Sequence, residues 1–140
     1  MKILVAVDGS SYTKRMLAYL AAHDEWLGEH HDYTVVHSVM AVPPRAAAAL
    51  DKAVLTSYYE DEAEKVFKSI RTFFGKQKLK ANFVAKVGHA ADNIAAVASK
   101  GKFDLLVMGS HGHGTLGNLV MGSVATKVMA HCSTPVLLVR

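Results

Sequence analysis

Short blocks of consecutive apolar residues alternate along the chain with longer blocks in which apolar residues recur every three or four positions. Four to eight apolar residues in a row, bounded by turn residues, are typical of strands buried on both faces of a parallel sheet. The strands predicted on this basis are Lys2 to Val7, Tyr33 to Val39, Ala81 to Val87, Phe103 to Met108 and Pro135 to Val139.

The blocks between the strands have the apolar spacing of helices. The predicted helices run from Ser10 or Ser11, either of which can cap the helix, to Leu27 before Gly28, from about Ala46 to Phe74, from Ala91 to Gly101, and from Ser123 to His131. Two prolines predict an extended loop from Val42 to Arg45 before the second helix. The clearest core stripe of that helix consists of Val66, Ile70, Phe73 and Phe74.

Regular alternation of strands and helices predicts an α/β fold. With a helix in every crossover, the expected structure is a doubly wound, five-stranded parallel sheet with three α/β/α layers. The 140 residues contain no repeat and no linker that would divide them, so residues 1–140 are expected to form one Rossmann-like domain.

Ligands of such sheets bind beyond the carboxyl ends of the strands, where the strand order reverses. Three loops with suitable chemistry leave that edge: Asp8 to Ser10, Met40 to Arg45, and the glycine-rich segment after Met108. They can meet only if the first and fourth strands are neighbours.

The glycine-rich segment Gly109 to Gly117 contains four glycines, which are expected to allow positive φ angles and to turn backbone N–H groups toward an anion. Gly122-Ser123 then begins a helix, whose N-terminal N–H groups also favour phosphate. An ordinary surface loop is the alternative. Gly112 to Gly117 matches a dinucleotide-binding fingerprint, but the acidic residue expected about twenty positions later is missing, because nothing after Asp104 is acidic. No P-loop pattern is present either.

Composition narrows the class of protein. Hydrophobic residues make up 51% of the chain, which favours a globular domain over a disordered one. The net charge of +4 is scattered, so we expect neither nucleic acid nor a membrane as partner. A single cysteine, Cys132, and no signal-peptide or membrane-spanning stretch indicate a cytoplasmic protein.

Four segments of the sequence resemble the universal stress protein family. They are ILVAVDGS, VVHSV, DLLVMGSHGHG and GSVATKVMAHCSTPVLLV, in the order that the family has them. The spacing Gly109-x-x-Gly112, nine residues, then Gly122-Ser123, resembles the ATP-binding branch of that family. The resemblance implies the strand order 3-2-1-4-5, the adenine nucleotide α-hydrolase-like fold, and a homodimer formed through the C-terminal strand, Val136 to Val139.

The resemblance also implies a site for ATP, or for ADP or AMP, with or without Mg²⁺. The implied contacts are Ala6 and Val7 near the base, Ser38 through its backbone to adenine, Asp8 to the ribose, Met108 and Gly109 beside the ribose, and His111, Gly112, Gly122, Ser123 and Val124 around the phosphates. Ala125 stands where the family can have a threonine, so one phosphate contact is expected to be missing. Asp8 has a second interpretation as a helix cap.

Two further alternatives concern the histidines. His111 and His113 could bind zinc together with His131 or Cys132, but the latter pair is expected at the far end of the last helix, so we predict no metal site. His111, His113 and Ser123 could assist proton transfer, while the loop has no acidic residue and no arginine for phosphoryl transfer. Lys127 is either solvated or near phosphate. We predict a nucleotide-responsive regulatory module, with a weak ATP hydrolase or a stress-related interaction protein as alternatives and no catalytic residue assigned.

Overall fold

Five parallel strands form one sheet in the computed structural model, which describes residues 1–23, 25–114 and 120–140. They are β1 (Lys2–Ala6), β2 (Asp32–Val39), β3 (Ala81–Val87), β4 (Leu105–Gly109) and β5 (Val136–Val139). Their order across the sheet is β3-β2-β1-β4-β5, and every neighbouring pair is parallel. The predicted sheet and its order are therefore confirmed, with β1 beside β4.

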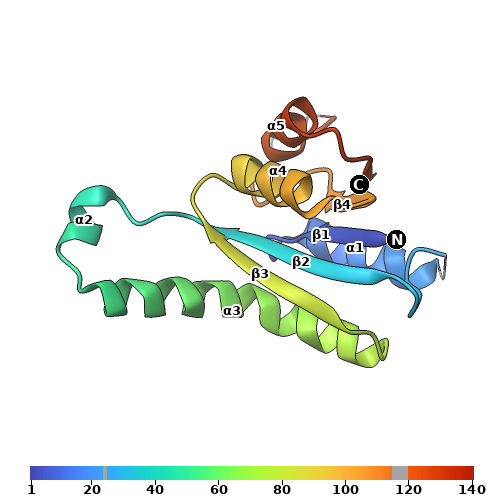
Figure 1. Ribbon diagram of the computed structural model, residues 1–140, viewed down its shortest axis with the longest axis horizontal. Helices are drawn as coiled ribbons and strands as arrows, with labels where there is room; N and C mark the ends of the chain where they lie inside the picture. The colour runs from blue at the N-terminus through green and yellow to red at the C-terminus, as the bar shows by residue number, and fades with distance from the viewer. Residues whose placement is uncertain (24, 115–119) are drawn as a thin grey trace.

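Helices cover both faces of the sheet. The helices are α1 (Ser11–Ala22), α2 (Pro44–Ala48), α3 (Lys52–Lys76), α4 (Ala90–Gly101) and α5 (Ser123–His131). Helices α1 and α3 lie on one side of the sheet and α4 and α5 on the other, while α2 lies beyond the end of the sheet (Figure 1). The predicted three layers are present.

The apolar strands divide the core into two clusters because successive side chains of a strand point to opposite faces. In β1, Ile3 and Val5 belong to the cluster under α1 and α3, whereas Leu4 and Ala6 belong to the cluster under α4 and α5. All four are buried. This two-sided burial explains why the strands are apolar without alternation.

The first helix is shorter than predicted. It ends at Ala22 instead of continuing to Leu27, and its C-cap residue His23 has extended backbone angles. The His23 ring donates from Nδ1 to the carbonyl of Tyr19, 2.8 Å away, and stacks on the Tyr19 ring at 4.2 Å. Leu27 still packs against the core, but from the segment after the helix. The helical spacing of Leu27 is therefore accidental.

The predicted helix from Ala46 to Phe74 is two helices. Pro44 begins α2, as proline can at the first helical position, so the expected extended loop ends two residues earlier, at Pro43. The chain then breaks at Asp51, which has extended angles and precedes α3. Of the predicted stripe, Ile70 and Phe74 are buried, and Val66 and Phe73 pack against the core less completely.

The remaining elements agree with the prediction to within two residues. Strand β4 begins at Leu105 rather than Phe103, because Lys102 turns into the left-handed region with φ of 50° after α4. No helix within the described residues combines the length and the hydrophobicity that crossing a membrane requires.

Candidate functional site

A cavity of about 210 Å³ lies beyond the carboxyl ends of β1 and β4, where the strand order reverses. The sequence-predicted contacts that line it are Ala6, Val7, Asp8, Ser38, Met108, Gly109, His111, Gly112, Gly122, Ser123, Val124 and Ala125. Every predicted contact therefore lies around one cavity. Whether each touches a ligand stays a prediction.

Six lining residues were not predicted as contacts. They are Thr13, Ala90, Ile94, Ser110, His113 and Gly114. Ala90 and Ile94 share one face of α4 near its start, which the strand order places beside the cavity. In contrast, the loop from Met40 to Arg45 lines none of it, because the chain leaves β2 toward α2, away from the site (Figure 1). The expectation that this loop joins the site was wrong.

Asp8 follows β1 and holds the turn into α1. Its Oδ1 accepts hydrogen bonds from the Ser10 backbone N–H and the Thr13 hydroxyl, each 2.9 Å away. The Thr13 Oγ1 in turn accepts from the Asp8 backbone N–H at 3.1 Å. Ser10 occupies the N-cap position of α1, but its hydroxyl makes no capping bond. Asp8 therefore holds the turn before α1 through one of its two oxygens, but it does not cap the helix, whose N-cap residue is Ser10.

The second carboxylate oxygen of Asp8 faces the glycine-rich loop. A β-carbon at position 112 would lie 2.8 Å from Asp8 Oδ2, so only glycine fits there unless the carboxylate moves. At position 109, a β-carbon would lie 2.8 Å from the Tyr12 β-carbon. The glycines therefore allow close approach between segments about one hundred residues apart in sequence.

Positive φ angles do not explain the described glycines of this segment, and for Gly109, Gly112 and Gly114 that expectation was wrong. Among the described glycines, only Gly9 and Gly88 have positive φ. A β-carbon at position 114 would meet no atom of the described residues within 4 Å, and Gly117 lies outside the described residues. Steric access rather than backbone strain is the reason for Gly109 and Gly112.

Two histidines connect the glycine-rich loop to its surroundings. His113 donates from Nε2 to the backbone carbonyl of Asp8 at 2.6 Å, which joins the loop to the end of β1. His111 Nδ1 lies 2.8 Å from the hydroxyl of Ser110, which is buried, and its ring lies 5.0 Å from that of Tyr12. These contacts fix the loop beside the cavity.

Helix α5 begins at the wall of the cavity. Its N-cap residue Gly122 donates its N–H to the Ser110 carbonyl at 2.7 Å, and no side chain caps the helix. A β-carbon at position 122 would lie 3.1 Å from both the Ser110 carbonyl and the His111 α-carbon. The next residues, Ser123 and Val124, carry N–H groups that have no intrahelical acceptor. A helix start of this kind attracts anions.

Ala125 belongs to the core rather than to a polar wall. It is 2% exposed and packs in the cluster under α4 and α5. The neighbouring Thr126 hydroxyl donates back to the Gly122 carbonyl at 2.8 Å. The chain therefore has no hydroxyl at position 125 to add to the site.

Ser38 is held by α4 and the turn before it. Its hydroxyl donates to the Gly88 carbonyl at 3.0 Å and accepts from Asn93 Nδ2 at 2.8 Å. Gly88, with φ of 120°, also donates its N–H to the Val39 carbonyl. Because the hydroxyl is occupied, Ser38 offers its backbone to the cavity more readily than its side chain.

The charge of the site is low. Asp8 is the one acidic residue among the described lining residues, and none of them is lysine or arginine. Lys127 is exposed and does not line the cavity.

Within the described part of the chain, no three His, Cys, Asp or Glu side chains gather closely enough to hold a metal ion. His131 and Cys132 lie at the opposite end of α5 from Gly122.

Comparison with known proteins gives relatives that match nearly the whole of this chain. A universal stress protein of Thermus aquaticus is 36% identical over 138 residues, which cover 99% of this chain and 97% of the relative. The structure of the universal stress protein UspA from Lactobacillus plantarum has a TM-score of 0.76 at 20% identity, and the match covers 100% of this chain and 97% of that one. The latter likeness supports the fold.

Two further similar structures contain nucleotides. The universal stress protein from Archaeoglobus fulgidus was solved in complex with dAMP; its TM-score is 0.68 at 22% identity, with 100% and 98% of the two chains covered. A universal stress protein family protein from Arabidopsis thaliana was solved with AMP bound; its TM-score is 0.70 at 14% identity, with 99% and 90% covered. The universal stress protein family model matches residues 1–140, and this chain belongs to that family.

Proposed function

We propose that this chain binds an adenine nucleotide, foremost ATP, in the cavity beyond β1 and β4, and acts as a nucleotide-responsive regulatory module of the stress response. The observation that carries the proposal is the close approach of Gly112 to Asp8 Oδ2 beside the start of α5. This geometry joins a carboxylate that can accept from ribose hydroxyls to a helix N-terminus that favours phosphate.

The lining residues fit the parts of a nucleotide. Ala6, Val7 and Ile94 supply apolar surface for a base, and Met108 lies next to them on β4. The polar groups of the cavity wall are the carboxylate of Asp8 and the N–H groups at the start of α5. Ligand pockets usually measure about 300–1,000 Å³, so a cavity of about 210 Å³ suits the nucleoside, with phosphates extending along the glycine-rich loop. Complexes of relatives with dAMP and AMP support an adenine ligand.

The spacing of Gly109, Gly112 and Gly122-Ser123 favours the ATP-binding branch of the family. Mg²⁺, when it accompanies ATP, is usually held by phosphates and one or two carboxylates. Asp8 is the carboxylate available for this at the described cavity wall. Its Oδ1 is already committed to Ser10 and Thr13, which leaves Oδ2 for a ligand or an ion.

Holding a nucleotide is better supported than hydrolysing it. Fast phosphoryl transfer needs cationic groups to stabilise the transition state. The described lining has no lysine or arginine, and residues 115–119 of the sequence add none. We therefore expect ATP turnover to be slow or undetectable, and steady multiple turnover at about 1 s⁻¹ or faster would contradict the regulatory assignment.

The decisive experiment compares Gly112→Ala with Gly114→Ala by calorimetric titration with ATP and AMP. Alanine at position 112 must displace the Asp8 carboxylate, which is held by two hydrogen bonds, whereas alanine at 114 meets no atom of the described residues within 4 Å. A hydrogen bond to a charged group is worth about 1.5–3 kcal/mol. We therefore expect Gly112→Ala to weaken binding about ten- to a hundredfold, and Gly114→Ala to bind like the wild type.

Equal affinity of both variants, or no binding of adenine nucleotides by the wild type, would refute the site. Substitution of Gly122 is less informative, because a side chain there would press on the backbone of the loop at Ser110 and His111. Mass spectrometry of small molecules released from freshly purified protein would identify the natural nucleotide. Protein that carries no nucleotide and binds none would favour the interaction-protein alternative.

A further inference from the structure

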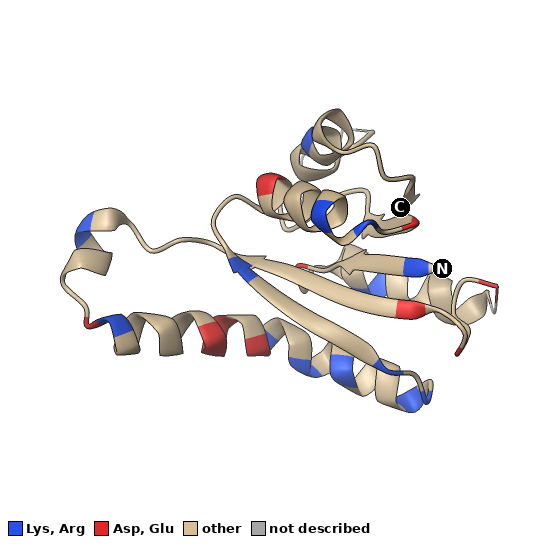
Figure 2. Ribbon diagram, viewed as in Figure 1, with Lys and Arg blue, Asp and Glu red and all other residues tan. Residues whose placement is uncertain are grey.

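A basic side chain lies next to the nucleotide cavity without lining it. Arg15 of α1 is exposed, and its Cζ lies 5.0 Å from the centre of the Tyr12 ring. Within the described part of the chain, its guanidinium makes no hydrogen bond and no ion pair. Lys14 and Arg15 are the charged residues of α1, and Figure 2 shows basic but no acidic colour on that helix. The N–H groups of Arg15 are therefore available to an anion.

Tyr12 connects Arg15 to the cavity. The Tyr12 ring lies 5.0 Å from the ring of His111, which lines the cavity. Tyr12 is also held against the end of β4, because a β-carbon at position 109 would lie 2.8 Å from the Tyr12 β-carbon. Side chains of a helix lean toward its N-terminus. Arg15 therefore extends over Tyr12 toward the carboxyl ends of the strands, where the cavity lies.

His111 borders the start of α5 as well. A β-carbon at position 122 would lie 3.1 Å from the His111 α-carbon. Helices α1 and α5 lie on opposite sides of the sheet (Figure 1), and His111 lies between the N-terminus of α5 and Tyr12 of α1. A phosphate chain that begins at the N-terminus of α5 and passes His111 therefore leads to Arg15.

We propose that Arg15, held by Tyr12, binds the terminal phosphate of a nucleoside triphosphate and makes the site prefer ATP over AMP. This inference rests on the proposed function and adds a phosphate contact that the cavity wall does not supply, since the described lining has no lysine or arginine. A terminal phosphate carries up to about two negative charges. Arginine fits this position because its guanidinium stacks on aromatic rings and also pairs with two phosphate oxygens at once.

The contact with Tyr12 distinguishes Arg15 from the neighbouring lysines. The exposed side chains of Lys14, and of Lys127 one turn into α5, make no hydrogen bond, ion pair or ring contact within the described residues. No described contact therefore directs either lysine toward the phosphates. A cation that contacts the phosphates equally before and during transfer tightens binding without accelerating the reaction. Slow ATP turnover is thus still expected.

The test compares the affinities for ATP and AMP, both titrated with Mg²⁺ present, by calorimetry of the whole chain. Arg15→Ala removes charge-assisted hydrogen bonds to the terminal phosphate, so we expect its ATP affinity to fall about tenfold. Its AMP affinity should not change, because AMP does not reach Arg15. Lys14→Ala is the matched control, since it removes the same charge from the adjacent position of α1 and should leave both affinities unchanged.

A second pair of variants tests the role of the Tyr12 ring. Tyr12→Leu removes the ring that positions Arg15 and should lower the ratio of ATP to AMP affinity about threefold. Tyr12→Phe retains the ring and should bind both nucleotides like the wild type. Higher ionic strength should reduce the wild-type preference for ATP, because the Arg15 contact is exposed.

Two results would overturn this inference. They are a wild-type ratio of ATP to AMP affinity in Arg15→Ala, and an equal fall of that ratio in Lys14→Ala, which would indicate a general effect of charge. In both cases intact AMP binding leaves the proposed function standing. Wild-type protein that binds neither nucleotide would contradict the proposed function and this inference together.

Discussion

Tyr33 connects the stability of the fold to alkaline pH. It is 2% exposed, and its hydroxyl donates to the Gly28 carbonyl at 2.8 Å. Burial raises the pKa of Tyr33 above its ordinary value of 10.0. The folded state therefore favours the neutral phenol.

We expect Tyr33→Phe to reduce the free energy of unfolding at neutral pH by about 0.5–1.5 kcal/mol, because the Gly28 carbonyl loses the Tyr33 hydroxyl and keeps only the His31 N–H, 3.3 Å away, as a donor. The stability that comes from the raised pKa is complete below pH 10.0 and is lost as pH rises through the folded-state value. The difference between the two proteins should thus shrink above pH 10.0. Denaturant titrations of both proteins at neutral and alkaline pH measure this, and a constant difference would contradict it.

The sequence predicted which residues line the site better than it predicted the contacts between them. The glycine spacing identified Gly112, but its close approach to Asp8 depends on two strands that are distant in sequence and adjacent in the sheet. Thr13 was missed because its hydrogen bonds to Asp8 form only when the turn before α1 closes. Spacing alone contains no information on that turn.

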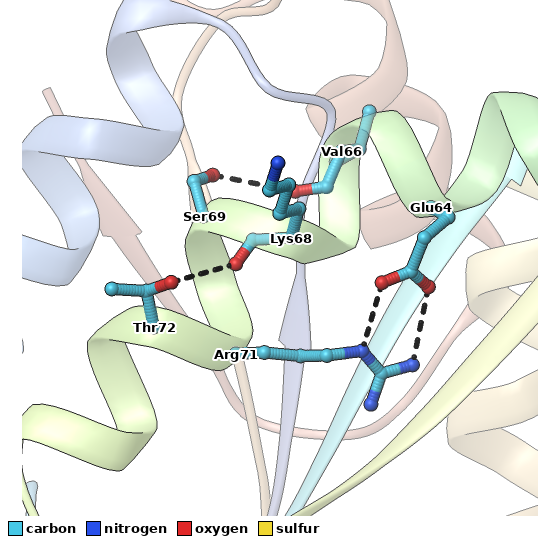
Figure 3. Close-up of polar contacts among 6 residues, drawn as sticks. All are labelled: Glu64, Val66, Lys68, Ser69, Arg71 and Thr72. Carbon is cyan, nitrogen blue, oxygen red and sulfur yellow. Dashed lines mark hydrogen bonds and ion pairs between the residues drawn. The ribbon is translucent and has the colours of Figure 1, made fainter.

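At the scale of the element, α3 is held by its apolar face and not by its surface ion pairs. Figure 3 shows Arg71 paired to Glu64 through two nitrogens, with Nε 3.2 Å from Oε1. Both side chains are about half exposed. The Arg71 guanidinium also lies 4.0 Å from the centre of the Phe83 ring on β3.

We expect Glu64→Gln to change the free energy of unfolding by less than about 0.5 kcal/mol, because exposed pairs contribute little. Arg71→Ala should cost about 1 kcal/mol, since it removes the contact with Phe83 as well. Thermal unfolding of the two variants separates the contributions. A larger loss for Glu64→Gln than for Arg71→Ala would show that the ion pair dominates.

The element boundaries that the sequence missed are those set by local hydrogen bonds. Apolar spacing predicted α5 correctly. The same spacing wrongly continued α1 to Leu27, because it gives no signal for the hydrogen bond from the His23 ring to the Tyr19 carbonyl at the end of the helix. Likewise, the alanines before Asp51 are good helix formers. Propensity therefore gave no signal for the break between α2 and α3.

For the whole molecule, β5 is the open edge beside β4, and we propose that it forms the homodimer by pairing with β5 of a second copy. The carbonyls of Pro135 and Val139 accept hydrogen bonds from the N–H groups of Leu106 in β4 and of Ser110, the residue after β4. Because backbone groups alternate in direction along a strand, those of Val136 and Leu138 face the open edge. This leaves two residues able to pair with another strand.

Leu138→Pro should remove one edge donor without breaking the bonds to β4. We expect its sedimentation mass to fall from dimer to monomer at concentrations where the wild type is dimeric, with ATP affinity retained. Leu138→Ala is the control, because it shortens the side chain and retains the N–H. Unchanged mass of Leu138→Pro would place the dimer interface elsewhere.

The fold class was predictable because five apolar blocks alternate with amphipathic ones. The strand order was not, since parallel strands of similar composition can be arranged in several ways; it came from the family resemblance. The cavity wall contributed by Ala90 and Ile94 was missed for the same reason, because α4 borders the site only once β1 lies between β2 and β4.

The pairing of β1 with β4 has a consequence for biosynthesis. During synthesis Asp8 leaves the ribosome before Gly112 and the start of α5, which follow about one hundred residues later. The half-made chain contains the carboxylate but not the loop that faces it. Nucleotide could therefore bind only after the chain through α5 has been made, and by binding only that state it would stabilise the folded domain over its shorter nascent forms.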